Sequence, residues 1–291
     1  MKTSSIQSET DITAMKQLIK SLGGQASVVD FEELILMDSV RAATRLWWEG
    51  DTLAAFAYID DYNNLYFEYE PSLFNDDLGS AIVAWGVECM QSRNREMNSS
   101  DPLDVSCSAN DKLHLPLFLK HGFEQTPIRS LAYKRSASLP IPEAALPQGF
   151  SIRSIKRDEV EQAVALHQAA FGTDQMTVER RLAIMDAPDY VPDLDLVVAA
   201  PDGGLAAFCI CGMEEVDGKL IGYTDPIGAH PAFRGKGLAK AVTIHAMREL
   251  VKRGVVELEL GTSSENTPMQ RLAESLGFEK VSEKIWFSKK V

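Results

Sequence analysis

A short glycine-rich and basic stretch in the second half of the chain carries the pattern with the clearest chemical meaning. It reads HPAFRGKGLAKA from His230 to Ala241, just ahead of an apolar helical pattern. Gly235 and Gly237 allow a tight turn and a close approach of the backbone to a ligand. The start of the following helix offers unpaired N–H groups and a partial positive charge, to which Arg234 and Lys236 add. The stretch therefore predicts a cradle for an anion such as phosphate.

Two other phosphate-binding motifs are excluded by their spacing. The chain contains no G-x-x-x-x-G-K-[ST], so it has no Walker loop. The spacing R-x-x-G-x-A, with Gly237 and Ala239 as its last fixed residues, differs from the G-x-G-x-x-G of dinucleotide-binding folds. Taken alone, the stretch also fits a glycine-rich turn with solvated lysines, and this alternative stays open.

Strand and helix patterns surround the cradle. Residues 194–231 predict three strands, with turns at Asp202-Gly203-Gly204 and at Asp217-Gly218. A long amphipathic helix follows from Gly237 to Arg253, and then the strand VVELEL. A helix from about Asn266 to Leu276 and a final strand pair complete the order.

Upstream of these elements, the strand FSIRSI precedes two helical patterns, which Asp158 and Thr177 can cap. The first half of the chain shows a similar alternation of helices and strands. The order predicts an α/β fold of the α+β kind, with a mixed sheet, in both halves.

Short phrases recur in the two halves at a nearly constant offset. LAAF recurs after 152 residues and GFE after 155, and Pro71 and Pro226, which end YEP and TDP, are also 155 residues apart. Between the halves, residues 136–149 contain three prolines and no period, which is typical of a linker. We therefore predict two tandem copies of one domain, residues 1–135 and residues 150–291.

The second copy resembles the GCN5-related N-acetyltransferases, the GNAT family. One hallmark of that family is a strand followed by [QR]-x-x-G-x-[GA] at the start of a long helix, matched here from Arg234 to Ala239. The other is a strand and then an Asn that opens a short helix ending in Gly-Phe, matched by Asn266, Gly277 and Phe278. The resemblance covers residues 150–291. It implies two tandem GNAT-like acyl-CoA N-acyltransferase domains, as in mycothiol synthases.

The resemblance also implies a co-substrate, acetyl-CoA. In the family the loop binds the pyrophosphate through backbone N–H groups, and the pantetheine arm lies between two splayed parallel strands. No His or Cys cluster has the spacing of a zinc site, so no metal is expected. The implied cofactor-binding residues are Ile227, Gly228, Ala229, Arg234, Gly235, Lys236, Gly237, Leu238, Ala239 and Asn266.

The first copy departs from the pattern at the segment that aligns with the cradle. This segment, PSLFNDDLGSAIVAW, has one glycine, no arginine and two aspartates. Acidic residues at a helix start repel phosphate. We therefore expect residues 1–135 to be a degenerate GNAT-like domain that does not bind CoA. The linker 136–149 joins it to the C-terminal GNAT domain 150–291, which holds the acetyl-CoA site.

Acetyl transfer to an amine needs a base for the amine proton and donors for the developing negative charge. In the family the base often comes from the strand before the cradle, where Tyr223 and Asp225 lie two residues apart. Both are catalytic candidates, with Asp225 as the base. The alternative is that Asp225 only ends a strand before Pro226. Glu257 and Glu259, which share a face of the next predicted strand, are the second choice.

The general acid that is usual in the family is missing. It is a tyrosine four residues before Gly-Phe, and the sequence has Ala273 there in the second copy and Phe118 in the first. Either a hydroxyl such as that of Tyr223 or Ser264 donates the proton, or the thiolate leaves unaided, since a thiol has a pKa of about 8.5. Cys209 is a less favoured nucleophile, because it lies mid-strand with no base in evidence.

Composition limits the partners and the location. The net charge of −13 argues against nucleic acid as a main partner. No apolar run approaches the roughly 20 residues that span a bilayer, and the N-terminal residues lack the apolar segment of a secretory signal. We expect a cytoplasmic protein, a monomer or homodimer, with neither a membrane nor a nucleic-acid partner.

The expected function is acetyl-CoA-dependent N-acetyl transfer to the primary amine of a small molecule, directly from the thioester. Tyr223 and Asp225 favour this enzyme. The missing tyrosine favours the alternative, a non-catalytic module that binds acyl-CoA or a protein partner.

Overall fold

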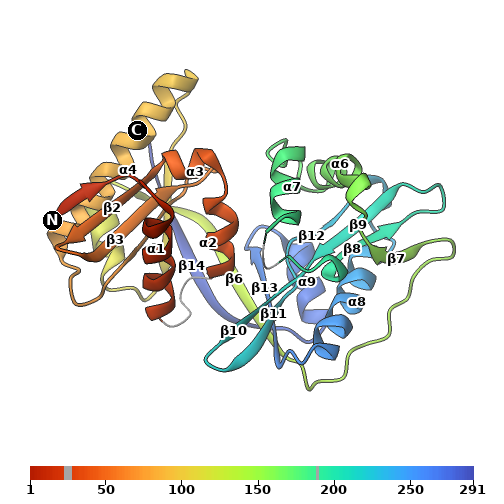
Figure 1. The fold of residues 1–291 in the computed structure, drawn as a ribbon. Helices are drawn as coiled ribbons and strands as arrows, with labels where there is room; N and C mark the ends of the chain where they lie inside the picture. The colour runs from red at the N-terminus through yellow and green to blue at the C-terminus, as the bar shows by residue number, and fades with distance from the viewer. Residues whose placement is uncertain (23–27, 188–189) are drawn as a thin grey trace. The chain divides into compact units, whose positions relative to one another are not determined.

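The computed structural model describes residues 1–22, 28–187 and 190–291 (Figure 1). The chain divides into two compact units. Unit 1 comprises Met1–Ser130 together with Glu283–Val291, and unit 2 comprises Leu131–Ser282. Both contain helices and strands, which confirms the predicted mixed α/β class.

The two units differ from the predicted domain boundaries at both ends. Residues 131–149, assigned by the sequence to the end of the first domain and the linker, lie in unit 2, and residues 283–291 lie in unit 1. The reason is that two long strands each belong to both units, β6 (Glu124–Ser136) and β14 (Glu279–Lys289). The boundaries of the sequence repeats themselves stay a prediction.

The predicted linker packs closely against unit 2. Ile141, Ala144 and Leu146 lie on the hydrophobic core of that unit. The buried guanidinium of Arg135 donates to the carbonyls of Leu139 and Pro140 at 3.1 and 2.7 Å. The segment is therefore an ordered part of unit 2.

Unit 1 combines helices with an antiparallel sheet in the order β1-β2-β3-β4, and its strand β5 pairs antiparallel with residues 284–289 of β14. Its elements are β1 (Lys2–Ser4), α1 (Glu9–Ser21), α2 (Val28–Ile35), α3 (Asp38–Ala42), β2 (Thr44–Glu49), β3 (Thr52–Ile59), β4 (Leu65–Tyr69), α4 (Asp76–Met97), β5 (Leu103–Ser108) and α5 (His114–Lys120).

Unit 2 contains a four-stranded sheet in the order β12-β9-β8-β7 and a second group of strands in the order β10-β11-β13-β6. Its elements are β7 (Ser151–Ser154), η1 (Arg157–Glu159), α6 (Val160–Phe171), α7 (Val178–Met185), η2 (Pro192–Leu194), β8 (Asp195–Ala199), β9 (Leu205–Ile210), β10 (Gly212–Val216), β11 (Lys219–Tyr223), β12 (Ile227–Ala229), η3 (Pro231–Phe233), α8 (Leu238–Lys252), β13 (Glu257–Ser263) and α9 (Thr267–Ser275).

Helices cover both faces of the four-stranded sheet of unit 2 (Figure 1). The side chains of its buried strands alternate between these two faces. Leu196 and Val198 of β8 belong to the main core with Val242 of α8. Val197 and Leu166 of α6 belong to a smaller cluster on the opposite face. Successive residues of a strand point to opposite faces, so the unbroken apolar run in β8 is what a doubly covered strand requires.

The three strands predicted over residues 194–231 are five in the structure. The second is divided at Cys211 into β9 and β10, and the third is divided at residues 224–226 into β11 and β12. The division follows from a change of sheet, because β11 pairs with β10 and β13 whereas β12 pairs with β9.

One of the two predicted caps is confirmed. Thr177 caps α7, and its Oγ1 accepts a hydrogen bond from the Arg180 N–H at 3.1 Å. Asp158 does not cap α6; it lies inside the turn η1, and Glu159 is the residue before the helix. Over the described residues, no helix has both the length and the apolarity to span a bilayer.

Candidate functional site

Two parallel strands of unit 2 separate beside the predicted cradle. β11 pairs with β13 from Ile221 to Tyr223, opposite residues 257–259. The Thr224 N–H still donates to the Glu259 carbonyl at 3.1 Å. Beyond that bond the chain enters β12, which belongs to the other sheet. This divergence is the splayed pair that the family resemblance implies.

Among the residues that the structure describes, β12 is the outermost strand of its sheet and pairs along one edge only, with β9. The Pro226 carbonyl accepts a hydrogen bond from β9 at 3.1 Å, and the His230 N–H donates to β9 at 2.9 Å. In an antiparallel ladder the residues that bond to one neighbour alternate. Gly228 therefore also faces β9, and the backbone N–H and C=O groups of Ile227 and Ala229 face the open edge.

Gly228 is required by packing. A Cβ at this position would lie 2.4 and 2.8 Å from two ring carbons of Phe208 and 2.9 Å from the Cβ of Ala170. Contacts below 3.0 Å force a shift of the neighbours. The glycine thus lets α6 and β9 pack tightly behind the strand whose other edge is open.

The loop between β12 and α8 has the conformation that the cradle needs. His230 caps the turn η3, and its Nδ1 accepts from the Ala232 N–H at 3.2 Å. Gly235 and Gly237 have φ angles of +77° and +75°, the left-handed region that favours glycine. A Cβ at either glycine would meet no atom within 4 Å. Backbone conformation therefore requires these glycines, and the space beside them is open.

The N-terminus of α8 is uncapped and carries no acidic residue in its first turn. The Ala241 N–H makes the first helical hydrogen bond, to the Gly237 carbonyl at 2.9 Å. The N–H groups of residues 238–240 therefore point out of the helix end without an intrahelical partner. A helix end of this kind attracts anions through its N–H groups and its dipole.

The side chains of the predicted cradle differ in accessibility. Arg234 is exposed, and its Nη2 donates to the Ala170 carbonyl at the end of α6 at 3.0 Å. Lys236 is also exposed, and Ala239 is half-buried. Leu238 is only 2% exposed, so its backbone is the part that a ligand can reach. The contact of these residues with a cofactor stays a prediction.

Asn266 has a local structural role. It is the N-cap of α9, and its Oδ1 accepts from the Met269 N–H at 3.2 Å. The side-chain oxygen of Asn266 is thus used by the helix. A cofactor contact of Asn266 stays a prediction.

The two catalytic candidates lie where β11 and β12 separate. Tyr223 is the last residue of β11, and its hydroxyl donates to Glu214 Oε2 at 3.2 Å. Asp225 follows outside the strand and is exposed, and its Oδ2 accepts from the Gly261 N–H at 3.2 Å. Asp225 and Tyr223 are thus held by different neighbours, Gly261 from β13 and Glu214 from β10. Their catalytic roles stay predictions.

The second-choice carboxylates are engaged by a lysine. Glu257 and Glu259 share a face of β13 and both pair with Lys134 Nζ, at 2.9 and 2.6 Å. The bridging raises the pKa of Lys134, mainly through hydrogen bonds to the two carboxylates. Because one cation holds both groups, they are less suited than Asp225 to receive a proton from an amine.

Two other sequence expectations concern buried residues. Ala273 is 0% exposed within the core, so this position offers no donor to a leaving thiolate. Cys209 is also buried, with its sulfur 3.4 Å from that of Cys211. Their hydrogen bond and burial raise the pKa of Cys209 well above its usual value. A thiol held protonated in this way is a poor nucleophile.

Three groups around the candidate site escaped the sequence reasoning, namely Lys134, Glu214 and the Gly261 N–H. Lys134 comes from β6, more than a hundred residues before its partners, and a backbone N–H has no side-chain signature. Alternation in GMEEV could have pointed to Glu214 as a neighbour of Tyr223 across the predicted hairpin. Within residues 1–22, 28–187 and 190–291, no His, Cys, Asp or Glu side chains form a group that could hold a metal ion.

Comparison with known proteins gives a consistent result for the second copy and for the whole chain. Residues 160–278 match the Acetyltransferase (GNAT) family. The chain is 28% identical over 245 residues to the mycothiol acetyltransferase of Thermobispora bispora, covering 80% of this chain and 79% of that protein. It is 28% identical over 242 residues to that of Pseudarthrobacter chlorophenolicus, covering 79% and 72%.

Solved structures show the same fold over the full length. A GCN5-related N-acetyltransferase from Sphaerobacter thermophilus has a TM-score of 0.70 and 22% identity, over 99% of this chain and 95% of that one. A tandem GNAT protein from the clavulanic acid biosynthesis pathway, solved without AcCoA, has a TM-score of 0.72 and 14% identity, over 99% and 98%. With the motifs, the splayed strands and the relatives in agreement, residues 160–278 match the GNAT family, and the protein is an N-acetyltransferase of tandem architecture that resembles the mycothiol acetyltransferases.

Proposed function

We propose that the chain transfers the acetyl group of acetyl-CoA directly to the primary amine of a small molecule, and that unit 2 does the chemistry. The observation that carries the proposal is the pairing of two features in one place. These are the uncapped, acid-free start of α8 and the open edge of β12 beside it. A phosphate and an amide-containing arm are what such a pair can hold.

The residues of unit 2 fit acetyl-CoA in two parts. The N–H groups at the start of α8 and the left-handed turn at Gly235 and Gly237 would bind the pyrophosphate. The backbone groups of Ile227 and Ala229 would pair with the amides of the pantetheine arm, as an added strand pairs with a sheet edge. When bound, acetyl-CoA supplies the activated acetyl thioester.

Asp225 is the proposed base. Its carboxylate is exposed beside the strand opening, and the Gly261 N–H holds one of its oxygens. Tyr223 directs its hydroxyl proton to Glu214, so donation to a thiolate would require that hydrogen bond to be exchanged. Unaided departure of the thiolate is the simpler alternative, since Ala273 offers no proton.

Cofactor binding is tested by titration calorimetry with acetyl-CoA. We expect a stoichiometry near one per chain. The Gly237→Asp variant should lose binding, because a carboxylate would occupy the anion site. The Gly237→Asn variant is the matched control, since Asn tolerates the same left-handed backbone without the charge. Binding of two equivalents, or equal loss in both variants, would contradict the assignment.

The base is tested separately from binding. The Asp225→Asn variant should lose about 100-fold or more in kcat, while the Kd for acetyl-CoA stays unchanged. The matched Glu257→Gln variant should lose far less, because Lys134 already engages that carboxylate. Equal losses in the two variants would move the base to β13.

One observation favours a second candidate, a non-catalytic module that binds acyl-CoA or a protein partner. Ala273 is buried and has no proton to give, and the Tyr223 hydroxyl already donates to Glu214, so neither position supplies a ready general acid. A thiol-release assay over a broad panel of amines, amino acids and aminoglycosides separates the two. Tight acetyl-CoA binding without release of thiol on any acceptor would favour the module.

A further inference from the structure

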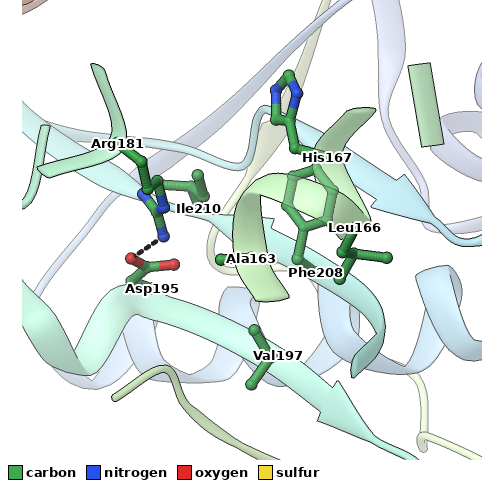
Figure 2. A pocket seen from close by; sticks show the side chains of 8 residues that line it. All are labelled: Ala163, Leu166, His167, Arg181, Asp195, Val197, Phe208 and Ile210. Carbon is green, nitrogen blue, oxygen red and sulfur yellow. Dashed lines mark hydrogen bonds and ion pairs between the residues drawn. The ribbon is translucent and has the colours of Figure 1, made fainter. Parts of the chain in front are cut away.

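A small cavity lies under α6 and α7 of unit 2, with strands β8 and β9 as its floor (Figure 2). Its volume is about 10 Å³, which is close to the room that one water molecule needs. Most of its wall is apolar, with Leu166, Val197 and Phe208 among the lining residues. Two charged residues, Arg181 of α7 and Asp195 of β8, also line it.

The two charged residues form a buried ion pair whose hydrogen bonding is one-sided. Arg181 is 3% exposed and Asp195 is 1% exposed. Arg181 Nη2 donates to Asp195 Oδ2, and the Tyr190 hydroxyl donates to the same oxygen at 2.7 Å. Figure 2 shows the guanidinium directed at the carboxylate. One carboxylate oxygen thus takes both local donors.

Two further atoms of the pair are buried without a partner among the described residues. Arg181 Nη1 is a donor with no acceptor, and Asp195 Oδ1 is an acceptor with no donor. Leaving such a group unpaired costs about 1 to 3 kcal/mol. Because the cavity borders both residues, a bound group there can satisfy both atoms at once.

The cavity selects for a neutral group. The guanidinium and the carboxylate cancel in charge. His167, which also lines the cavity, is neutral at pH 7, because burial and the nearby Arg181 lower its pKa to about 4. Arg181 Nη1, Asp195 Oδ1 and the Nδ1 of His167, which is also buried without a partner, suit a group that both accepts and donates. Water and an alcohol hydroxyl have that chemistry, whereas an ammonium or a carboxylate does not.

The cavity is close to the site of transfer. Asp195 pairs with Ile210 across β8 and β9, and the Ile210 N–H donates to the Pro226 carbonyl. Two strand spacings, about 10 Å, therefore separate the backbone of Asp195 from that of Pro226, which follows the candidate base. α6 links the two places, because its Ala170 packs behind Gly228 while its His167 lines the cavity.

We propose that this cavity is a subsite for one neutral, hydroxyl-sized group, filled by an ordered water in the free protein and by a hydroxyl of the acceptor during acetyl transfer. The second part rests on the proposed function. The acceptor class that follows is an amine that also carries a hydroxyl group.

The test compares two series of probes, straight-chain amino alcohols and n-alkylamines of the same lengths, with acetyl-CoA as donor. For the wild-type protein, kcat/KM should favour the amino alcohol by about tenfold at one chain length, the gain expected from a hydrogen bond to a charged pair. The Ala163→Leu variant should lose that preference, because Ala163 lines the cavity and a leucine fills it. The Ala165→Leu variant on the exposed side of α6 is the matched control and should keep it.

A preference at no length, or one that survives Ala163→Leu, would overturn the acceptor subsite. Amines acetylated without any preference leave the proposed function intact, so the two failures are distinguishable. A crystal structure of the wild-type protein gives an independent readout. Density within hydrogen-bonding distance of Arg181 Nη1 and Asp195 Oδ1 is expected. A dry cavity would overturn the proposal whatever the activity.

Discussion

The long helices α4 and α8 of the two copies begin in opposite ways. α4 begins after Asn75, whose Oδ1 accepts from the Leu78 N–H at 2.9 Å. Asp76 and Asp77 place two carboxylates in its first turn, and Asp76 pairs with Lys120 at 2.6 Å. The start of this helix in unit 1 is therefore satisfied by side chains of its own unit.

The start of α8 in unit 2 has no side-chain cap and no carboxylate, and two glycines in the left-handed region precede it. The same element of the fold thus has a closed end in one copy and an accessible end in the other. The comparison shows that the fold can persist while the capacity to bind an anion depends on a few residues at one helix start.

The strand before the helix differs as well. Pro226 leads into β12, whereas Pro71, 155 residues earlier, leads into a turn with no strand before α4. In unit 1 the ring centroids of Phe74 and Tyr69 are 3.8 Å apart, and a Cβ on Gly79 would lie 3.0 Å from a ring carbon of Phe74. Aromatic packing thus occupies the segment that follows the strand. This supports the proposal that the first copy does not bind acetyl-CoA.

The largest effect is expected from Gly228→Ala, which would place an additional methyl group in the tightly packed region behind β12. The new Cβ would lie 2.4 Å from the Phe208 ring, so the free energy of unfolding should fall by about 3 kcal/mol, the upper range for overpacking. Urea unfolding measures this. The displaced strand edge should also weaken acetyl-CoA binding.

Gly212→Ala is the matched control, because a Cβ there meets no atom within 4 Å and its φ is not in the left-handed region. A change below about 1 kcal/mol is expected there. Equal effects of the two substitutions would remove the special role of the β12 packing.

The second prediction gives α8 the chemistry of α4. Ala239→Asp places a carboxylate in the first turn, as Asp77 does in unit 1. The Kd for acetyl-CoA should rise about 100-fold, while the free energy of unfolding should rise by about 0.5 kcal/mol through the helix dipole. Ala239→Asn should change both much less. If Ala239→Asp leaves the Kd unchanged, the helix start is not the anion site.

The third prediction concerns Glu68, which precedes Pro71 as Tyr223 precedes Pro226. Burial raises the pKa of Glu68 to about 7, with Lys284 opposing the shift. Between the ordinary value of 4.5 and about 7, the unfolded chain releases this proton while the folded chain keeps it. Stability from this group is therefore full below pH 4.5 and is lost as the pH rises to about 7.

Glu68→Gln should remove this loss, making the variant more stable than the wild type by about 2 kcal/mol at pH 8 relative to pH 5. Urea unfolding at the two pH values gives the difference. The exposed Glu88→Gln on α4 is the control and should keep the wild-type pH dependence. A Glu68 variant with that same dependence would show that the carboxyl ionises freely in the folded protein.

The sequence predicted the cradle because its determinants are local. Glycines at left-handed positions, a basic residue and a helical pattern lie within a few residues, and the structure places them at the start of α8 as expected. The tandem fold was likewise predictable, since repeated phrases at a constant offset carry it. The break between β11 and β12 was not, because both segments have strand patterns and only their partners show that the chain changes sheet.

The surroundings of the catalytic candidates depend on contacts between distant segments. Lys134 reaches Glu257 and Glu259 from β6, and Arg181 of α7 meets Asp195 of β8 in an apolar setting. Neither pair has a spacing that a periodic pattern could detect. For Asn266 the sequence pattern identified the residue but not its local role, because its side-chain oxygen caps α9.

The smallest effect is expected from Asn75→Ala, which opens the helix start of unit 1. Loss of the bond from the Leu78 N–H should lower the free energy of unfolding by about 1 kcal/mol, the usual cost of an N-cap. The Kd for acetyl-CoA should not change, because Asp76 and Asp77 still repel an anion there and unit 2 keeps its cradle. Asn75→Asp should restore the stability, since a carboxylate caps as well as an amide. If the Asn75→Ala variant bound a second equivalent of acetyl-CoA, the N-cap alone would be what prevents binding to the first copy, and the two aspartates of the first turn would not be.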